Sequence, residues 1–356
     1  MPIRILSASD VQAALPMPKA IEAMQHAYGQ LSAGKAVVPP RQHISTDQGV
    51  TLIMPAYLPE RSENVKQRQI LSHGMPGEVD TGFIPLTYTP SDAGSRAKLG
   101  IKVVSVYDNN PNLGLPRITA TVLVLDPATG TPKAFMDGTS LTAIRTGAGG
   151  GVAADLLARK DANTVGLFGA GVQARAQLQA VIAVREIACV NLISRTQAST
   201  QQLAAEISEW TDAPEVNLVS TSQEVVAEAD IVLCATTSAT PLFDGNALQP
   251  GTHITAVGTF VPEKREVDTT TIRRADRIVV DSREACLEEA GDLIIPNAHI
   301  DAEIGEIVNG DKPGRQSDDE ITLFKSVGVA VQDAVAGAAV LAAAEEQGLG
   351  IVVEMA

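Results

Sequence analysis

One short segment constrains the fold more than any other. Residues 164–168 form an apolar run, and the chain continues at once through the turn Gly169-Ala170-Gly171-Val172-Gln173, followed by Ala174. In this G-x-G-x-x-A pattern the first glycine permits a tight turn after a strand, and the second lets the backbone approach a pyrophosphate. The small sixth residue lets a helix pack closely on the strand, and the helix N-terminus offers N–H groups to phosphate. The segment therefore predicts a strand–turn–helix unit that binds a dinucleotide.

The chain around this turn alternates between short apolar runs and helical segments. We expect helices over residues 140–158 and 173–184, and strands over residues 164–168, 189–193, 231–235, 253–257 and 277–280. Such an alternation predicts an α/β fold with a parallel sheet covered by helices. We therefore expect a Rossmann-type domain over residues 140–316.

The first half of the chain has a different pattern. A helical segment over residues 8–33 is divided by Pro16 and Pro18, and strand-like runs follow at 41–45, 51–56, 98–106, 119–126 and 131–136. The last two runs flank a turn and predict a hairpin. Residues 59–81 are polar and predict a surface loop. The tail, residues 321–346, predicts a helix whose apolar face is broad enough to pack on this first domain or on a second subunit.

Composition excludes several classes of function. The 356 residues include 27 Lys and Arg but 42 Asp and Glu, and aromatic residues make up only 3%, so we expect no nucleic-acid partner and no anionic membrane partner. Cys189, Cys234 and Cys286 are odd in number and far apart, which favours free thiols in a reducing compartment. No metal-ligand spacing occurs. No signal-peptide core or apolar run of ~20 residues occurs either, so we expect a cytoplasmic protein.

The end of the strand after the glycine-rich turn indicates the cofactor. An acidic residue there would bind the ribose 2′-hydroxyl of NAD(H). This chain instead carries Ser194-Arg195-Thr196. A guanidinium and two hydroxyls suit a 2′-phosphate, so NADP(H) is favoured and NAD(H) stays open as the alternative.

Four cationic residues are candidates for holding a substrate. Arg41 follows two prolines at the entry to a strand, and Lys102 stands within an apolar strand, where burial disfavours its charge unless an anion pairs with it. Arg117 follows Gly-Leu-Pro, and Arg145 lies in the helix that leads into the nucleotide-binding domain. Each alone is as readily explained as a surface charge or a structural ion pair. Together they provide what an amino- or imino-acid carboxylate and a cofactor phosphate require.

Over nearly its whole length the chain resembles the ornithine cyclodeaminase/μ-crystallin family. The matching motifs are PR at residues 40–41, LIMPA at 52–56, GIKVV at 100–104, GLP at 114–116, LTAIRTG at 141–147, GAGVQ at 169–173, ITAVG at 254–258, EAGDL at 289–293 and FKSVGVAVQD at 324–333. The region 60–97 looks longer than the link usual in the family. We therefore assign none of the family's substrate or cofactor contacts to residues 60–97.

The resemblance implies a fold and a reaction. It implies an α+β substrate-binding and dimerisation domain, formed by residues 1–139 with 317–356, and hence a homodimer. It implies hydride transfer between a nicotinamide and the Cα of a small amino or imino acid. Arg41 and Lys102 match the residues that bind the substrate carboxylate, Lys102 also matches the proton donor to the imine nitrogen, and Met54 and Val327 match substrate contacts. Residues 169–173 and 194–196 match positions that line the cofactor in the family. The other matching cofactor positions are Arg117, Arg145, Thr146, Thr236, Val257, Gly258, Lys264 and Ser326.

One departure from the family narrows the expected substrate. Cyclodeaminases carry a carboxylate shortly after the AVG motif, and alignment on Pro262 and Lys264 places Phe260 at that position. A phenyl ring cannot accept a proton or pair with a second ammonium group. We therefore expect a ketimine reductase that converts Δ1-pyrroline-2-carboxylate or Δ1-piperideine-2-carboxylate to proline or pipecolate. The alternatives are an ornithine cyclodeaminase, an alanine-type or N-alkyl amino-acid dehydrogenase, and an NADPH-dependent binding protein like μ-crystallin.

Overall fold

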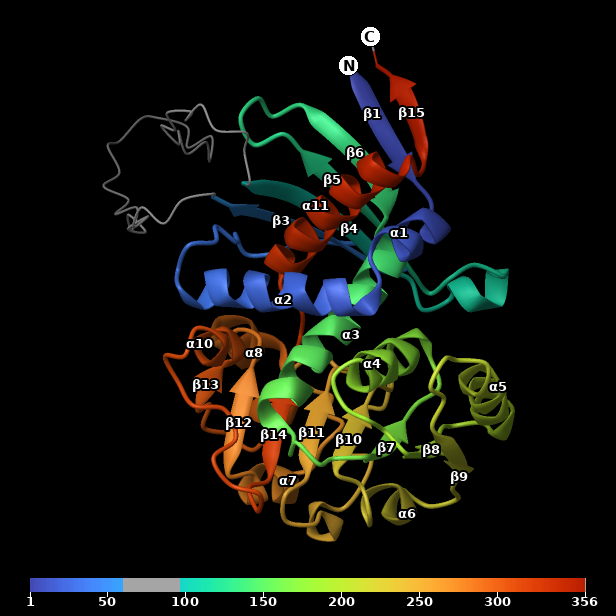
Figure 1. Ribbon diagram of the computed structural model, residues 1–356, viewed down its shortest axis with the longest axis vertical. Helices are drawn as coiled ribbons and strands as arrows, with labels where there is room; N and C mark the ends of the chain where they lie inside the picture. The colour runs from blue at the N-terminus through green and yellow to red at the C-terminus, as the bar shows by residue number, and fades with distance from the viewer. Residues whose placement is uncertain (60–96, 356) are drawn as a thin grey trace.

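The computed structural model describes residues 1–59 and 97–355, which form two layers, each built on its own sheet (Figure 1). The expected loop at 59–81 and the long link at 60–97 lie almost wholly outside the described residues. Among the residues described, no helix is long and apolar enough to cross a membrane. All three cysteines are free thiols.

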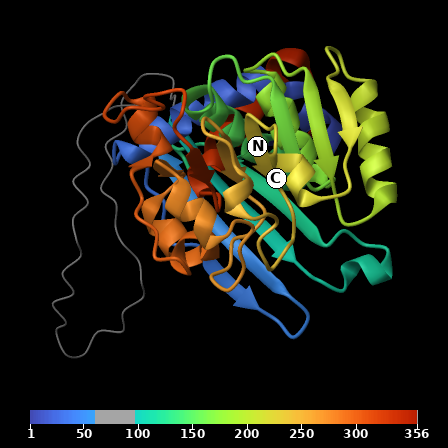
Figure 2. The same cartoon turned by 90° about the horizontal axis from the view of Figure 1, so that it is seen from below.

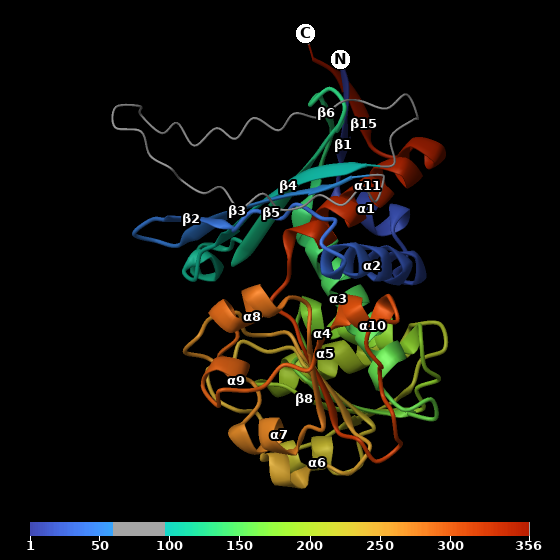
Figure 3. The ribbon, with the colours of Figure 1, turned by 90° about the vertical axis from the view of Figure 1, so that its left-hand side faces the viewer.

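The lower layer is built on the parallel sheet that the alternating pattern predicts. Its eight strands pair in parallel in the order β13-β12-β14-β11-β10-β7-β8-β9. They are β7 (Thr164–Phe168), β8 (Cys189–Ile193), β9 (Glu215–Leu218), β10 (Ile231–Cys234), β11 (His253–Ala256), β12 (Arg277–Val280), β13 (Ala302–Glu303) and β14 (Thr322–Lys325). The helices on its two sides are α4 (Val172–Ile182), α5 (Gln197–Ser208), α6 (Ser222–Val226), α7 (Thr269–Arg274), α8 (Arg283–Glu289), α9 (Gly291–Ile294) and α10 (Ile304–Val308) (Figure 3). The α/β prediction is confirmed.

The upper layer is a mixed sheet of seven strands in the order β15-β1-β6-β5-β4-β3-β2. Its strands are β1 (Pro2–Leu6), β2 (Gln42–Ser45), β3 (Val50–Leu58), β4 (Lys98–Val106), β5 (Ile118–Leu125), β6 (Pro132–Asp137) and β15 (Ile351–Glu354). The helices α1 (Ala8–Ala14) and α11 (Ala330–Gln347) pack on it, and α2 (Met17–Ser32) packs on α11 and α3. The hairpin β2–β3 projects past the lower layer in Figure 2. The break at Pro16 and the β5–β6 hairpin are as predicted.

The tail differs from its prediction. We expected one helix over residues 321–346, but Thr322–Lys325 is the buried strand β14 and the helix begins only at Ala330. A strand buried on both faces lacks polar alternation, so its pattern is the same as that of a buried helix. Because β14 lies inside the parallel sheet, a domain boundary at residue 316 is too early. We propose that the chain returns to the upper layer after Lys325.

The helix α3 (Gly138–Leu157) joins the two layers (Figure 3). It contacts β5 at one end and β11 and β14 towards the other, and it packs along α4. At Gly147 a side chain would collide with the carbonyl of Ala176 in α4, so glycine permits this close approach. α3 therefore holds Arg145, near its middle, at the junction of the layers.

Candidate functional site

The glycine-rich turn has the geometry of a phosphate site. Gly169 adopts a φ of +107°, and its N–H donates to the carbonyl of Ile193 at 2.9 Å. Gly171 is the N-cap of α4, and no atom lies within 4 Å of the position that a side chain would take there. The Oε1 atom of Gln173 is buried without a hydrogen-bond partner in the described structure. Open space and helix N–H groups together fit a dinucleotide pyrophosphate, whereas the Gln173 oxygen, which only accepts hydrogen bonds, can pair with a ligand donor but not with phosphate.

The end of β8 carries the residues expected to select the cofactor. The Ser194 hydroxyl lies 2.7 Å from that of Ser199, and the Thr196 side chain caps α5. These two hydroxyls hold the helix start, whereas Arg195 is exposed. Arg195 is thus the residue of the three best placed to meet a 2′-phosphate.

The loops after β10, β11 and β14 lie side by side, since these strands are neighbours. They carry Thr236, Val257 with Gly258, and Ser326. Ser326 donates its hydroxyl to Oδ2 of Asp281 at 2.7 Å, and the backbone N–H groups of Val327 and Gly328 donate to the same oxygen. Asp281 therefore fixes the turn that leads from the lower layer back to the upper one.

A buried ion cluster forms where β4, α3 and α11 meet. Lys102 Nζ lies 2.7 Å from Oδ2 of Asp333, and both side chains are 2% exposed. The other oxygen of Asp333 accepts from Arg145 Nε at 3.1 Å, and Arg145 Nη1 donates to Oε1 of Gln332 at 2.9 Å. Burial, with Arg145 nearby, lowers the pKa of Lys102 to about 8, while Asp333 opposes that shift. Lys102 is therefore able to exchange a proton near neutral pH.

Arg41 extends this cluster towards the lower layer. Its Nε lies 3.1 Å from Oε1 of Glu289, and its Nη2 donates to the carbonyl of Gly328 at 2.6 Å. Burial raises the pKa of Glu289, and Arg41 opposes that rise. Three cations, Lys102, Arg145 and Arg41, thus face two carboxylates, Asp333 and Glu289. Within the cluster the cations outnumber the carboxylates by one, so it can pair with the carboxylate of an amino or imino acid, while Glu284, Glu288 and Glu303 add negative charge nearby.

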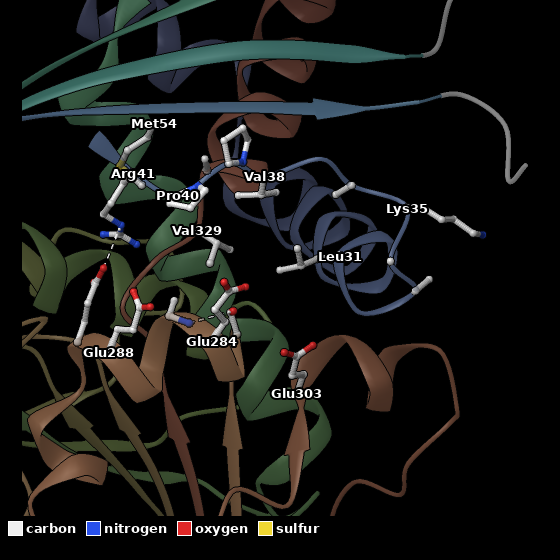
Figure 4. Close-up of a pocket in the computed structure, with 18 of the residues that line it drawn as sticks. Leu31, Lys35, Val38, Pro40, Arg41, Met54, Glu284, Glu288, Glu303 and Val329 are labelled. Carbon is white, nitrogen blue, oxygen red and sulfur yellow. Dashed lines mark hydrogen bonds and ion pairs between the residues drawn. The ribbon is translucent and has the colours of Figure 1, made fainter. Parts of the chain in front are cut away.

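A cavity of about 850 Å³ opens beside this cluster. Pro40, Arg41 and Met54 line it from the upper layer, and Glu288 and Glu289 of α8 line it from the lower one (Figure 4). Lys102 pairs in register with Met54 on the neighbouring strand. Of the predicted substrate residues, Arg41 and Met54 therefore line the cavity, and Lys102 is buried beside Met54.

Four predicted residues lie outside the lining of this cavity. Arg117 forms an exposed ion pair with Asp108, 2.7 Å between Nε and Oδ1, on the connection between β4 and β5. Lys264 is exposed on the loop after β11, and on the same loop Phe260 is 41% exposed. Arg145, which is expected to line the cofactor, belongs to the ion cluster with Lys102.

Asp333 and Glu289 are the functional residues that sequence reasoning did not single out, although both stand in quoted motifs. An acidic residue in the first turn of an otherwise apolar helix is the signal that could have identified Asp333. Among residues 1–59 and 97–355, no group of side chains is arranged to hold a metal ion.

Comparison with known proteins agrees with this geometry. The model of the ornithine cyclodeaminase/mu-crystallin family matches residues 80–348. A Δ1-pyrroline-2-carboxylate reductase of Bacillus cereus is 42% identical over 268 residues, which cover 73% of this chain and 82% of that protein.

Two solved structures share the whole fold. Thermococcus litoralis Δ1-pyrroline-2-carboxylate reductase in complex with NADH and L-proline has a TM-score of 0.84 and 38% identity, covering 98% of this chain and 99% of that one. An archaeal alanine dehydrogenase dimer with bound NAD also has a TM-score of 0.84, at 29% identity over 100% of both chains. The chain belongs to the ornithine cyclodeaminase/mu-crystallin family.

Proposed function

We propose that this protein is an NAD(P)H-dependent reductase that converts cyclic imino acids, Δ1-pyrroline-2-carboxylate or Δ1-piperideine-2-carboxylate, to L-proline or L-pipecolate. The observation that carries the proposal is the buried ion cluster beside the cavity, in which three cations face two carboxylates and the lysine has a lowered pKa. The glycine-rich turn at the end of β7 fits a dinucleotide. Relatives that reduce a cyclic imine and bind NADH with proline support this assignment.

The chain's own residues have distinct roles in this reaction. Arg41 binds the substrate carboxylate and orients the ring. Arg145 and Lys102 add positive charge from the buried side of the ion cluster. A dinucleotide held at the glycine-rich turn would supply the hydride for the imine carbon. Lys102 gives a proton to the imine nitrogen, so that the C=N bond becomes CH–NH, and it recovers that proton from solvent. Asp333 holds the Lys102 ammonium in place between turnovers.

Cyclisation of ornithine needs a carboxylate for the substrate amine, and the segment after β11 offers none that is suitable. Phe260 stands at the position expected for it. Glu263 is exposed, and the Glu266 carboxylate is wholly buried and already accepts three hydrogen bonds. This arrangement favours a reductase over a cyclodeaminase.

A second candidate is reduction of an open-chain imino acid. The cavity of about 850 Å³ falls in the range of ~300–1,000 Å³ typical of sites for larger ligands, and a five-membered ring fills only part of it. The archaeal alanine dehydrogenase with the same fold supports this alternative.

We propose NADP(H) as the preferred cofactor, because Arg195 lies exposed at the end of β8 and no acidic residue stands there. NAD(H) remains the alternative, and the relatives solved with NADH and NAD support it.

We also propose a homodimer that forms through the upper sheet. α11 packs on one face of this sheet, and on the other face an apolar row crosses five strands in register. The row consists of Pro55, Ile101, Leu123, Phe135 and Ile5. Phe135 and Ile5 are each 41% exposed, which is typical of a surface that is covered in an assembly.

The test follows NADPH absorbance with each cyclic imine and with pyruvate plus methylamine as an open-chain source. NADH serves as the cofactor control, and ammonia release from L-ornithine is measured in parallel. Rapid oxidation of NADPH by a cyclic imine, without ammonia from ornithine, is the expected result. Ammonia and proline from ornithine would overturn the argument from Phe260 and restore the cyclodeaminase.

A further inference from the structure

One buried carboxylate links two loops of the dinucleotide cleft. Glu266 is 0% exposed, and its Oε1 accepts from both the N–H and the hydroxyl of Thr236, each at 2.7 Å. Its Oε2 accepts from the N–H of Gly258, also at 2.7 Å. Thr236 follows β10 and Gly258 follows β11, so a single side chain joins the carboxyl ends of two neighbouring strands.

The same loops also pack directly on each other. A side chain at Gly258 would collide with the carbonyl of Thr236, and one at Gly169 would meet the carbonyl of Ala235. The loops after β7, β10 and β11 therefore contact backbone to backbone. Because this packing is so close, a small shift of the Thr236 loop would change the shape of the cleft.

A second buried group holds Glu266 itself. Oδ1 of Asp292 accepts from the N–H groups of Glu266 and Val267, at 2.7 and 3.0 Å. Its Oδ2 accepts from the Thr259 hydroxyl and lies 2.8 Å from Lys325 Nζ, where both charged side chains are 0% exposed. Lys325 also donates to the carbonyl of Thr259 at 2.8 Å. The Glu266 backbone is thus fixed to the end of β14.

The order of the strands shows which half of a dinucleotide these loops serve. The chain runs from β7 outward through β8 to β9, and then returns to the other side of β7 for β10 and β11. A dinucleotide binds across such a switch point, with its pyrophosphate at the first turn. The adenosine half then lies over β8, beside Arg195, and the nicotinamide half lies over β10 and β11.

We propose that Glu266 is a positioning residue that sets the shape of the nicotinamide half of the cleft without touching the cofactor or the substrate. The inference rests on the proposed dinucleotide function. This positioning role needs the ionised carboxylate of Glu266, because both of its oxygens accept hydrogen bonds. An amide has only one acceptor oxygen, so a glutamine could hold the Thr236 loop or the Gly258 loop, but not both.

The test compares a whole cofactor with a fragment that lacks nicotinamide. Dissociation constants of NADPH and of adenosine 2′,5′-bisphosphate are measured by calorimetry for the native protein, Glu266→Gln and Glu263→Gln. Glu263 is exposed on the same segment, so its variant removes an equal charge without touching the network. For Glu266→Gln we expect NADPH to bind about tenfold more weakly, because one buried donor loses its partner. Binding of the fragment should stay within about twofold, and Glu263→Gln should match the native protein.

The outcomes separate this inference from the proposed function. Equal weakening of both ligands by Glu266→Gln, or no weakening of NADPH, would overturn the positioning role while leaving the reductase proposal intact. A native protein that binds neither NADPH nor NADH would overturn the proposed function itself. Should Glu266→Gln not fold, Glu266→Asp keeps the charge but is one methylene too short to hold both loops, and it should weaken NADPH but not the fragment. The opposite pattern would refute the inference.

Discussion

Replacing Lys102 by methionine tests the proposed chemistry most directly. Methionine keeps most of the apolar stem of the side chain and removes the ammonium, so the imine nitrogen loses its expected proton donor. Loss of a general acid lowers turnover by about 10²- to 10⁴-fold. We expect a fall of this size in kcat for imine reduction with unchanged NADPH binding, because the glycine-rich turn lies on another element.

The Lys102→Met substitution should leave the protein folded, so that a loss of kcat reports on the chemistry and not on unfolding. Removal of one partner from a buried ion pair costs about 3–5 kcal/mol when the other charge is left alone. Here Asp333 keeps Arg145, 3.1 Å away, as a second cation. Burial already disfavours the charged form of Lys102. We therefore expect the free energy of unfolding to fall by less than about 3 kcal/mol, with a cooperative melting transition retained.

The native protein should show the corresponding dependence on pH. Lys102 loses its proton as the pH rises through about 8, so imine reduction should fall about tenfold per pH unit above that value. Oxidation of proline needs the deprotonated amine and should rise over the same range. This opposite dependence is a signature that unfolding or loss of cofactor would not produce.

The assay is NADPH absorbance under saturating substrate from pH 6 to 10, with calorimetric binding of NADPH and thermal unfolding measured on the same samples. A Lys102→Met variant that keeps more than a tenth of the native kcat would refute the role as acid. So would a native rate of reduction that stays constant to pH 9.5.

Three further changes test the carboxylate site, the cofactor preference and the dimer. Arg41→Met should raise the KM of the imine roughly ten- to a hundredfold, since a charge-assisted hydrogen bond is lost, with NADPH binding unchanged; an equal loss of NADPH binding would contradict this. Arg195→Ala should raise the KM of NADPH roughly tenfold but leave that of NADH unaltered, and equal effects on both cofactors would show that no 2′-phosphate is bound there. Phe135→Glu should shift the mass measured by light scattering from dimer to monomer, whereas Leu113→Glu, at an exposed site on the β4–β5 connection, should not; a dimer that survives Phe135→Glu would place the interface elsewhere.

Much of the lower layer could be predicted because its signals are local. β7, β8 and β12 have the predicted bounds, since each is a short apolar run next to a turn. β14 could not be predicted as a strand, because a run buried on both faces has no period that separates it from a helix. β1 and β15 were missed because they pair with each other and join the two ends of the chain, which no local pattern reveals.

The site shows the same division between local and distant signals. Arg41 and Lys102 could be identified because a cation in or beside an apolar strand is locally unusual. Their partners could not, because Glu289 and Asp333 come from other elements far along the chain. Arg145 was assigned to the cofactor, and only the packing of α3 against α11 shows that it shares Asp333 with Lys102.

The hydrogen bond from Arg41 to Gly328 has a mechanical consequence. Gly328 belongs to the turn by which the chain passes back from the lower layer to the upper one, and Asp281 anchors that turn from below. A carboxylate that draws Arg41 towards itself competes for the guanidinium that braces this hinge. Binding of a substrate carboxylate would therefore weaken one of the two contacts that hold Gly328 in place, so the same guanidinium that recognises substrate also serves the connection between the layers.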